Sequence, residues 1–337
     1  MSPEKVTFIL CCDVDPDGRN VCDVSYETQK PKLSWDGVKK ALPPLVDHLC
    51  ALEKEHGVRL KVTWFVRSDD MMDRVYGDPC WPRVEFSELW DRLEDKGHEL
   101  GWHPHLWCLD ERKGSWYHET GDHDWIDKCL KDGFRAFKQC GFKEPACTRM
   151  GWDFMDNRIM GCLNGLGIQA DLSSLPGMSY QGRECFDDKI IGYHDWEKGH
   201  DSVYHPSKDD YKNPGKDSLK IVEIPVTVVP PPIIKKHSSR LLGKYFAGIR
   251  DRIHGERIPF HLDVPTGLFE YMFDHQLERA KKDLKRPIVC YFHPSDLLVS
   301  GMMDTVKDNL KHAANALKES GGSGLTVKEY LNIIDHS

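Results

Sequence analysis

The sequence predicts an α/β fold built on parallel strands. Apolar runs rich in β-branched residues, each bounded by polar or turn residues, alternate along the chain with segments whose apolar residues recur at helical spacing. Neighbouring parallel strands are usually joined by a crossover helix, so this alternation favours a parallel sheet or barrel over an all-α or all-β design. The 337 residues could form one large domain or two smaller ones.

The predicted elements follow one another in a regular order. The strand candidates are Val6–Cys12, Leu60–Val66, Glu99–Trp102, Ala146–Thr148, Gly167–Ala170, Ile221–Val229 and Ile288–Phe292. The segments with helical spacing are Leu42–Leu52, Phe86–Leu93, Trp125–Phe137, Phe154–Leu166, Leu268–Leu284 and Met302–Leu317.

Two segments interrupt the alternation. Residues 179–217 are rich in Gly, Asp, Tyr, His and Pro and have little periodicity, which is typical of a long functional loop. The run Pro230-Pro231-Pro232 ends a strand and opens a second insertion at about 233–265. We find no internal repeat and no long linker, so we expect a single domain over residues 1–337 with these two insertions.

Composition narrows the class of protein. A formal net charge of −8 and a pI of about 6.1 argue against a nucleic-acid binder, which usually presents a basic face. The 12 cysteines include no Cys-x-x-Cys pair and are spread along the chain, which favours a reducing compartment. The amino-terminal residues lack a signal-peptide pattern, and no apolar stretch approaches the ~20 residues of a membrane span. We therefore expect a cytoplasmic protein with no transmembrane segment.

Acidic residues follow the first strand candidate. Side chains alternate along a strand, so Asp13 and Asp15 project to the same side while Val14 packs on the other. This spacing can aim two carboxylates at one cavity. A turn or helix-cap role is the open alternative, because Asp-Pro-Asp-Gly at 15–18 is also a good turn sequence.

Histidines end two further strand candidates. His103 and His105 have the same period-two spacing, and His293 stands before Pro294, which cannot continue a strand ladder. Carboxylate oxygen and neutral imidazole nitrogen are the ligands of a water-activating metal, so the pattern points to metal-assisted hydrolysis. A hydrogen-bonded core histidine is the alternative for each. Arg149, where a short apolar run meets a Gly turn, could equally be an ordinary surface arginine.

Taken in order, these motifs resemble the polysaccharide deacetylase (NodB-homology) superfamily, carbohydrate esterase family 4 and its relatives. The similarity runs from Asp13 to His293, and the run Gly-His-Glu-Leu-Gly-x-His-x-His at 97–105 resembles a divergent branch. The resemblance implies a distorted (β/α)7-type barrel with parallel strands. It also implies that every candidate residue lies at the carboxyl end of a strand, which is the catalytic face of such barrels.

The resemblance also implies roles for the residues. Of the two aspartates, one would be the general base and the other a metal ligand; we assign Asp13 as the base and Asp15 as the ligand. His103 and His105 would complete the site of a divalent metal, for which we expect Zn²⁺. Arg149 would orient the catalytic aspartate, and His293 would be the general acid. The implied reaction removes an N-acyl group, expected to be acetyl, from an amino sugar or a glycan precursor.

This chain departs from the usual family pattern in three places. Val14 separates two aspartates that are normally adjacent, Trp107 stands where a second histidine is usual, and 150–152 replace the residues that normally follow the arginine. The first departure leaves open which aspartate is base and which is ligand.

Substrate contacts are expected from residues near the strand ends. The stretch 165–174 resembles the family's next strand, with Asp171 at its tip, and Trp107, Trp152, Trp196 and Tyr204 could stack on a sugar ring. Core packing is the alternative for each aromatic residue. The second insertion carries a basic run that could bind the phosphate of a nucleotide-linked or lipid-linked sugar, or be an ordinary solvated face: Lys235, Lys236, Arg240, Lys244, Arg250, Arg252 and Arg257.

Two other functions remain open. Relatives of this fold include amidases that act on a small non-sugar amide or ureide, and activity on a cyclic ureide alone would favour that class. A non-catalytic barrel that binds glycans would contain no metal and would keep its sugar affinity after Asp13→Asn.

Overall fold

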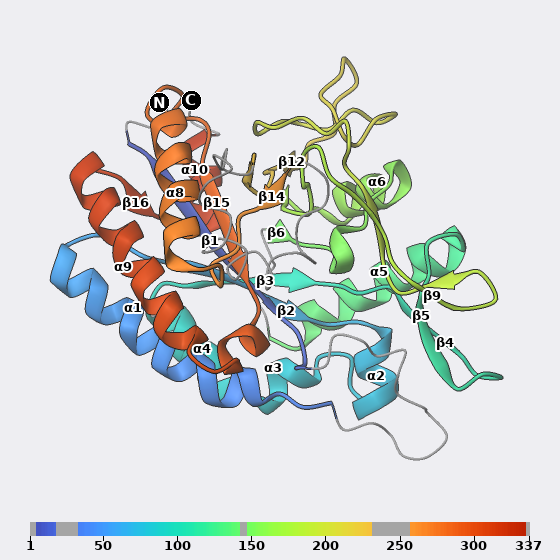
Figure 1. The fold of residues 1–337 in the computed structure, drawn as a ribbon. Coiled ribbons are helices and arrows are strands. Elements are labelled where there is room, and N and C mark those ends of the chain that lie inside the picture. The colour runs from blue at the N-terminus through green and yellow to red at the C-terminus, as the bar shows by residue number, and fades with distance from the viewer. Residues whose placement is uncertain (1–4, 18–32, 142–146, 231–256, 335–337) are drawn as a thin grey trace, which may run out of the picture.

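The computed structural model describes residues 5–17, 33–141, 147–230 and 257–334 (Figure 1). Its centre is a sheet of eight strands in the order β12-β7-β6-β3-β2-β1-β15, with β16 also paired to β1, and every pairing in it is parallel. The strands are β1 (Thr7–Val14), β2 (Val62–Arg67), β3 (Glu99–His103), β6 (Cys147–Thr148), β7 (Ala170–Asp171), β12 (Val222–Glu223), β15 (Ile288–Phe292) and β16 (Ser323–Gly324).

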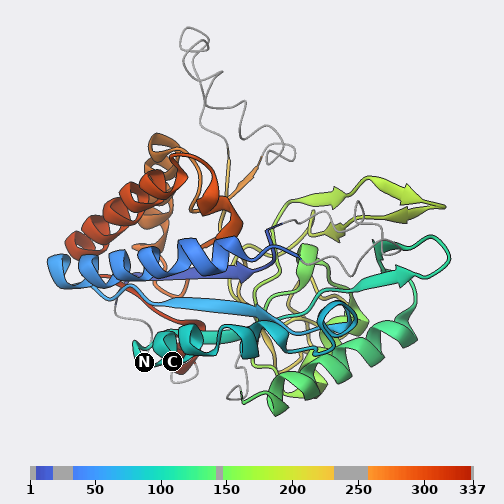
Figure 2. The same ribbon diagram turned by 90° about the horizontal axis from the view of Figure 1, so that it is seen from below.

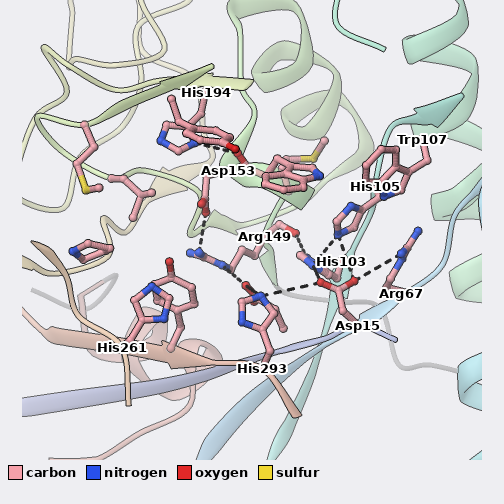
Figure 3. A pocket seen from close by; sticks show the side chains of 18 of the residues that line it. Asp15, Arg67, His103, His105, Trp107, Arg149, Asp153, His194, His261 and His293 are labelled. Atoms are coloured by element: carbon pink, nitrogen blue, oxygen red, sulfur yellow. Dashed lines mark hydrogen bonds and ion pairs between the residues drawn. The ribbon is translucent and has the colours of Figure 1, made fainter. Parts of the chain in front are cut away.

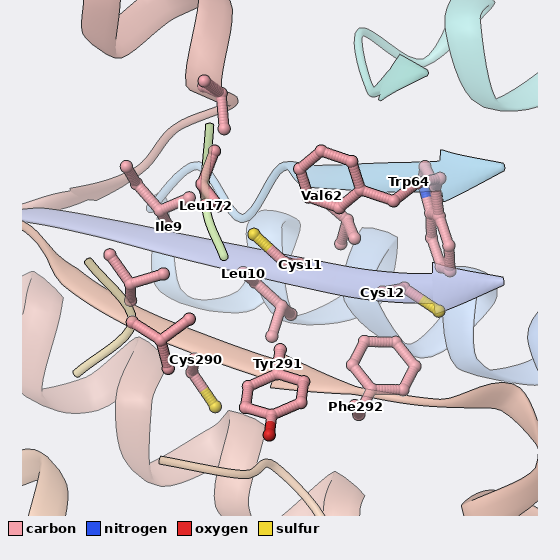
Figure 4. Close-up of a cluster of buried hydrophobic side chains, with 14 of the residues drawn as sticks. Ile9, Leu10, Cys11, Cys12, Val62, Trp64, Leu172, Cys290, Tyr291 and Phe292 are labelled. Atoms are coloured by element: carbon pink, nitrogen blue, oxygen red, sulfur yellow. The ribbon is translucent and has the colours of Figure 1, made fainter. Parts of the chain in front are cut away.

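The central strands are buried on both faces. All eight residues of β1 are buried, as a parallel strand covered by helices on both sides requires. Figure 4 shows Leu10 and Cys12 of β1 with Trp64 of β2 and Phe292 of β15 in the apolar cluster between these strands. This core fixes the strands whose ends carry the candidate site.

Helices cover the sheet. They are α1 (Leu42–His56), α2 (Asp70–Tyr76), α3 (Trp81–Glu85), α4 (Ser87–Asp95), α5 (His123–Gln139), α6 (Asn157–Leu166), α8 (Thr266–Ala280), α9 (Met302–Ser320) and α10 (Val327–Ile334). Asp69, Asp122 and Asp156 cap the amino ends of α2, α5 and α6 by accepting a backbone N–H of the first turn. Helices α1 and α8 both pack on α9, and Figure 2 shows α1 running along β1. None of the described helices is both long and apolar enough for a membrane span.

The chain after β12 closes the sheet into a distorted barrel. The backbone N–H groups of Ile224 and Val226 donate to the end of β7 and to the residues just after it, whereas the N–H of Thr227 donates to the carbonyl of Val289 in β15, at 3.1 Å. The chain then returns beside the same strand, where the N–H of Leu262 donates to Tyr291 at 2.9 Å. We call residues 224–227 the seam. The predicted barrel of parallel strands is confirmed.

One predicted strand is divided at the seam. Within Ile221–Val229 only Val222–Glu223 (β12) and Val228–Val229 (β13) are strands, and β13 pairs antiparallel with β14 (Ile258–Pro259). Pro225 has no N–H to offer to a ladder, and the chain changes partners two residues later, at Thr227.

The segment 179–217 is more regular than its sequence suggests. It contains β8 (Ser179–Gln181), β9 (Glu184–Phe186), β10 (Lys189–Ile190) and β11 (Tyr193–Asp195). Strand β10 pairs with β5 (Ser115–His118), which forms a hairpin with β4 (Trp107–Asp110), and these strands make a small antiparallel sheet beside the barrel (Figure 1). Most of the second insertion, residues 231–256, lies outside the described residues.

Candidate active site

The carboxyl ends of β1, β2, β3 and β15 open on one cavity of about 240 Å³. Parallel strands end at the same edge of a sheet, so residues far apart in the sequence meet there. All six residues predicted as catalytic groups or metal ligands line this cavity: Asp13, Asp15, His103, His105, Arg149 and His293. Figure 3 shows five of them, with Asp15 between the two imidazoles and Arg67.

Asp15, His103 and His105 form a compact group of potential metal ligands. Asp15 Oδ2 lies 3.5 Å from His103 Nε2, Asp15 Oδ1 lies 3.3 Å from His105 Nε2, and the two Nε2 atoms are 3.1 Å apart. Each residue offers one ligand atom, these atoms lie within 4.8 Å of one another, and all three side chains are buried. The sequence prediction thus names the residues that the fold brings together.

The donor set fits a cation. His103 Nδ1 lies 2.6 Å from the carbonyl of Arg149, and when Nδ1 carries the hydrogen that this carbonyl accepts, Nε2 keeps its lone pair toward Asp15. Asp15 Oδ1 is buried and makes no hydrogen bond within the described part of the chain. Lone pairs this close repel one another in a buried site unless a positive charge lies between them.

The pKa shifts of Asp15 and His105 favour the protonation states of ligands. At His103, burial is instead outweighed by the charges of Asp15 and Asp13, which raise its pKa. Burial alone would raise the pKa of Asp15, but the nearby charges of His105 and His103 outweigh it and hold the pKa well below its usual value. Burial, helped by Arg67, lowers the pKa of His105 to about 4. Near neutrality Asp15 is therefore a carboxylate and His105 a neutral imidazole, which are the forms that bind metal.

Asp13 faces a different partner. Arg149 Nε donates to Asp13 Oδ2 at 2.8 Å, while its Nη1 donates to the carbonyl of Leu172 at 2.5 Å. Burial would raise the pKa of Asp13, but the charge of Arg149, followed by those of His103 and His293, lowers it. Asp13 is therefore an ionised carboxylate beside the ligand group, held in place by a buried arginine.

His293 completes the group from the last barrel strand. Its Nε2 lies 3.7 Å from Asp13 Oδ2 and 4.0 Å from Asp15 Oδ2. On its other side, Nδ1 lies 3.4 Å from Asp296 Oδ2 in the short 3₁₀ turn Pro294–Leu298. The imidazole therefore lies between the two aspartates of the site and the carboxylate of Asp296, at the edge of the cavity.

The predicted substrate residues divide into two groups. Trp107 and Trp152 line the cavity, with their ring centroids 6.3 Å apart, and Trp152 stacks on Tyr180. The other three are not among its lining residues. Asp171 is buried and accepts from Ser173, the buried Trp196 donates to the carbonyl of Asp153, and Tyr204 donates to the carbonyl of Tyr211.

Two charged residues of the cavity were missed in the sequence. Arg67, at the end of β2, lies 3.5 Å from Asp15 and 2.7 Å from Asp69, and the strand-end rule that found the other residues could have found it. Asp153 Oδ1 lies 2.6 Å from Arg149 Nη2. Burial raises the pKa of Asp153 to about 6, although Arg149 opposes the shift. For His194, in the segment 179–217, the simpler prediction from the sequence is exposure to solvent. In the structure this side chain is buried and also lines the cavity.

Comparison with known proteins supports the fold. No family model and no curated protein sequence matches the chain. Among solved structures, a proposed polysaccharide deacetylase from Mycobacterium smegmatis is 13% identical, with a TM-score of 0.56 over 99% of this chain and 92% of that one. A proposed glycoside hydrolase/deacetylase from Parabacteroides distasonis is 12% identical, with a TM-score of 0.59 over 99% of this chain and 72% of that one. The resemblance predicted from the motifs is confirmed at the level of the fold.

Proposed function

We propose that the chain is a metal-dependent hydrolase that removes an N-acyl group, expected to be acetyl, from an amino sugar or glycan precursor. It has the fold of proteins described as a polysaccharide deacetylase and a glycoside hydrolase/deacetylase. One observation carries this proposal. A ligand group of Asp15, His103 and His105 lies beside an arginine-bound carboxylate, Asp13, in the same cavity.

Asp15, His103 and His105 would hold the divalent cation, for which we propose Zn²⁺ because two imidazoles and a carboxylate suit it. When bound there, such a cation polarises an acyl oxygen and lowers the pKa of a coordinated water toward ~7. Arg67 offsets part of the negative charge of Asp15 and keeps this carboxylate aimed at the two imidazoles.

Asp13 would take the proton of the attacking water as general base. Its lowered pKa keeps it unprotonated and ready to accept, and Arg149 fixes the direction in which its free oxygen points. His293 would then donate a proton to the departing nitrogen, because its Nε2 faces the same space from the end of β15, the neighbour of β1. The bond that breaks is the amide C–N bond, and the products are an amine and a carboxylate.

The aromatic wall beside the ligand group suits a sugar. Trp107 and Trp152 present aromatic surface on which a sugar ring can stack. Asp153 lines the same wall with 14% of its side chain exposed, so a hydroxyl of the substrate can donate to it.

The predicted phosphate-binding run lies outside the described residues except for Arg257. The eleven cysteines that the structure describes are free, which supports the proposed reducing, cytoplasmic environment.

A matched pair of isosteric variants tests the proposal. We expect Asp15→Asn to lose the bound metal and the activity, and Asp13→Asn to keep the metal while kcat on N-acetyl amino sugars falls by about 10²–10⁴-fold. Asp95→Asn, an exposed change on α4, is the control. Metal is measured by elemental analysis, and release of acetate measures turnover.

Other outcomes would identify the competing functions. Hydrolysis of a cyclic ureide with N-acetyl sugars untouched would point to the small-amide class. Sugar binding by a metal-free wild-type protein, retained in Asp13→Asn, would point to a glycan-binding barrel and refute the hydrolase.

A further inference from the structure

A second group of potential metal ligands lies outside the cavity. Asp78, Cys80 and Cys140 each offer one ligand atom, and within the described part of the chain these three atoms lie within 4.8 Å of one another. Asp78 and Cys80 belong to the turn between α2 and α3, and Cys140 is the residue that ends α5. None of the three lines the active-site cavity, so they take no part in the proposed hydrolysis.

The backbone holds all three donors in position. Asp78 Oδ1 accepts from the N–H of Cys80 at 2.8 Å, and the carbonyl of Cys80 accepts from Arg83 at 2.8 Å in the first turn of α3. The N–H of Cys140 donates to Ala136 at 3.0 Å within the last turn of α5. Ligands whose backbone is already fixed lose little conformational entropy when a metal binds.

We propose that Asp78, Cys80 and Cys140 form a second, structural zinc site, with two thiolates, one carboxylate and a water as the four ligands. Two sulfur donors favour zinc over magnesium or calcium, and the carboxylate oxygen is a usual zinc ligand. Cys80 is buried, whereas Asp78 and Cys140 are partly exposed, so solvent can reach the fourth position.

Charge supports the same assignment. Two thiolates and one carboxylate carry three negative charges, zinc carries two positive ones, and the remaining negative charge faces Arg83, which acts on Cys140. Burial raises the pKa of both thiols above their usual value. They are therefore protonated without metal, and zinc binding releases two protons to solvent with no change in oxidation state.

The position of the site gives it a structural role. Cys80 Sγ lies 3.3 Å from Ser68 Oγ, and Ser68 stands between Arg67 and Asp69 in the segment that follows β2. Arg67 pairs with Asp15, and Asp69 accepts from the N–H of His105 at 3.3 Å. A metal at Cys80 would therefore brace, from behind, the segment that contacts the carboxylate of Asp15 and the backbone of His105 in the active-site ligand group.

Metal counting on the full chain tests the proposal. Protein loaded with zinc in a reducing buffer and then dialysed should hold about one zinc fewer per molecule in Cys140→Ser than in wild type. Cys162→Ser, a part-buried thiol on α6 outside the group, is the matched control and should keep the wild-type content. His105→Ala tests the active site separately, so the second site can be present even if the first one binds no metal.

Cobalt provides a readout that does not depend on activity or on stoichiometry alone. Co²⁺ bound to thiolates absorbs strongly in the near ultraviolet, whereas Co²⁺ on imidazole and carboxylate does not. We expect this band in wild type, Cys162→Ser and His105→Ala, and its loss in Cys140→Ser. Absence of the band in folded, reduced wild-type protein, or an unchanged zinc content in folded Cys140→Ser, would overturn the site. So would a Cys80–Cys140 disulfide found in the protein isolated without reductant.

Discussion

Gly151 lies directly against the imidazole of His105. A β-carbon at position 151 would overlap the ring atoms Cγ, Nδ1 and Cδ2 of this histidine. The N–H of Gly151 also donates to the carbonyl of Pro104 at 2.9 Å, which ties the turn after β6 to the residue between the two histidines. The position of one proposed ligand therefore depends on the absence of a side chain 46 residues later.

Gly151→Ala should displace His105. The backbone at 151 tolerates alanine, so the cost comes from the clash with the ring, and overpacking of this kind typically costs about 1–3 kcal/mol. We expect metal affinity at the active site to fall by at least about tenfold while the fold is kept. Competition with a chromophoric chelator measures the affinity.

Gly161→Ala is the control for this change. Gly161 lies within α6, and a β-carbon there would meet nothing within 4 Å. Alanine should stabilise the helix by up to about 1 kcal/mol and leave metal affinity unchanged. Equal metal affinity in both variants would show that His105 is not held by this contact.

Arg149→Lys should separate the effect of a positive charge near Asp13 from the effect of the three contacts that the guanidinium makes. Lysine keeps a positive charge near Asp13, but it cannot reach Asp13, Asp153 and the carbonyl of Leu172 together as the guanidinium does. Misplacement of a reacting group by about 1 Å can cost 10²-fold, so we expect kcat to fall by about that factor with the metal content unchanged. Steady-state kinetics with elemental analysis checks this, and wild-type kcat in Arg149→Lys would remove the arginine from its proposed role.

Asp153→Asn should weaken substrate binding. If a substrate hydroxyl donates to this carboxylate, loss of the charge costs about 1.5 kcal/mol or more, so KM should rise by about tenfold with kcat little changed. A sugar analogue that lacks the hydroxyl should bind wild type and variant equally. A fall in kcat at constant KM would instead mean that Asp153 acts through Arg149.

His98 should make the protein less stable in acid. Its Nδ1 accepts from the N–H of Val62 at 3.0 Å, and burial, together with Lys61, lowers the pKa of His98 to about 4. Between pH 6.5 and about 4 this histidine is protonated in the unfolded chain but neutral in the folded chain. The contribution of neutral His98 to the free energy of unfolding is therefore complete above pH 6.5 and is lost as the pH falls toward 4. The loss amounts to about 3 kcal/mol.

His98→Asn isolates this effect, because the asparagine Oδ1 can accept the same hydrogen bond and does not titrate. Urea unfolding at several pH values measures the free energy of unfolding of both proteins. We expect the variant to lose less stability than wild type on acidification, and parallel pH profiles would assign the acid sensitivity to other groups.

Much of the barrel could be predicted because its strands are short, apolar runs with polar residues at their ends. The predicted strand Ile288–Phe292 has the bounds of β15, and Glu99–Trp102 stops one residue before the end of β3, since His103 is polar but buried. Helices α2 and α3 were missed because they have only seven and five residues, too few for a clear helical period, and α10 was missed as well. The division of the strand at Pro225 depends on a change of partner that only the closed barrel reveals.

The same rule explains which site residues were found. A polar residue at the end of a parallel strand must lie at one edge of the sheet, whatever the loops do, and this holds for Asp13, Asp15, His103 and His293. Asp153 reaches the cavity through a turn in which it and Trp152 have positive φ angles, of 54° and 58°, and no local pattern predicts such a turn. Trp196 and Tyr204 lie in the long segment, where packing against distant residues decides which aromatic rings reach the cavity.

The position of the ligand group along the chain also bears on how the protein is made. Asp15, His103 and His105 all belong to the first 105 residues, which contain β1, β2 and β3, whereas Arg149 and His293 come later. Three adjacent strands can pair as soon as they have left the ribosome, so these three side chains can come together on a partly synthesised chain. Arg149 and Gly151, which contact the two imidazoles, are added later. His293, the proposed proton donor, is synthesised well after the three proposed cation ligands.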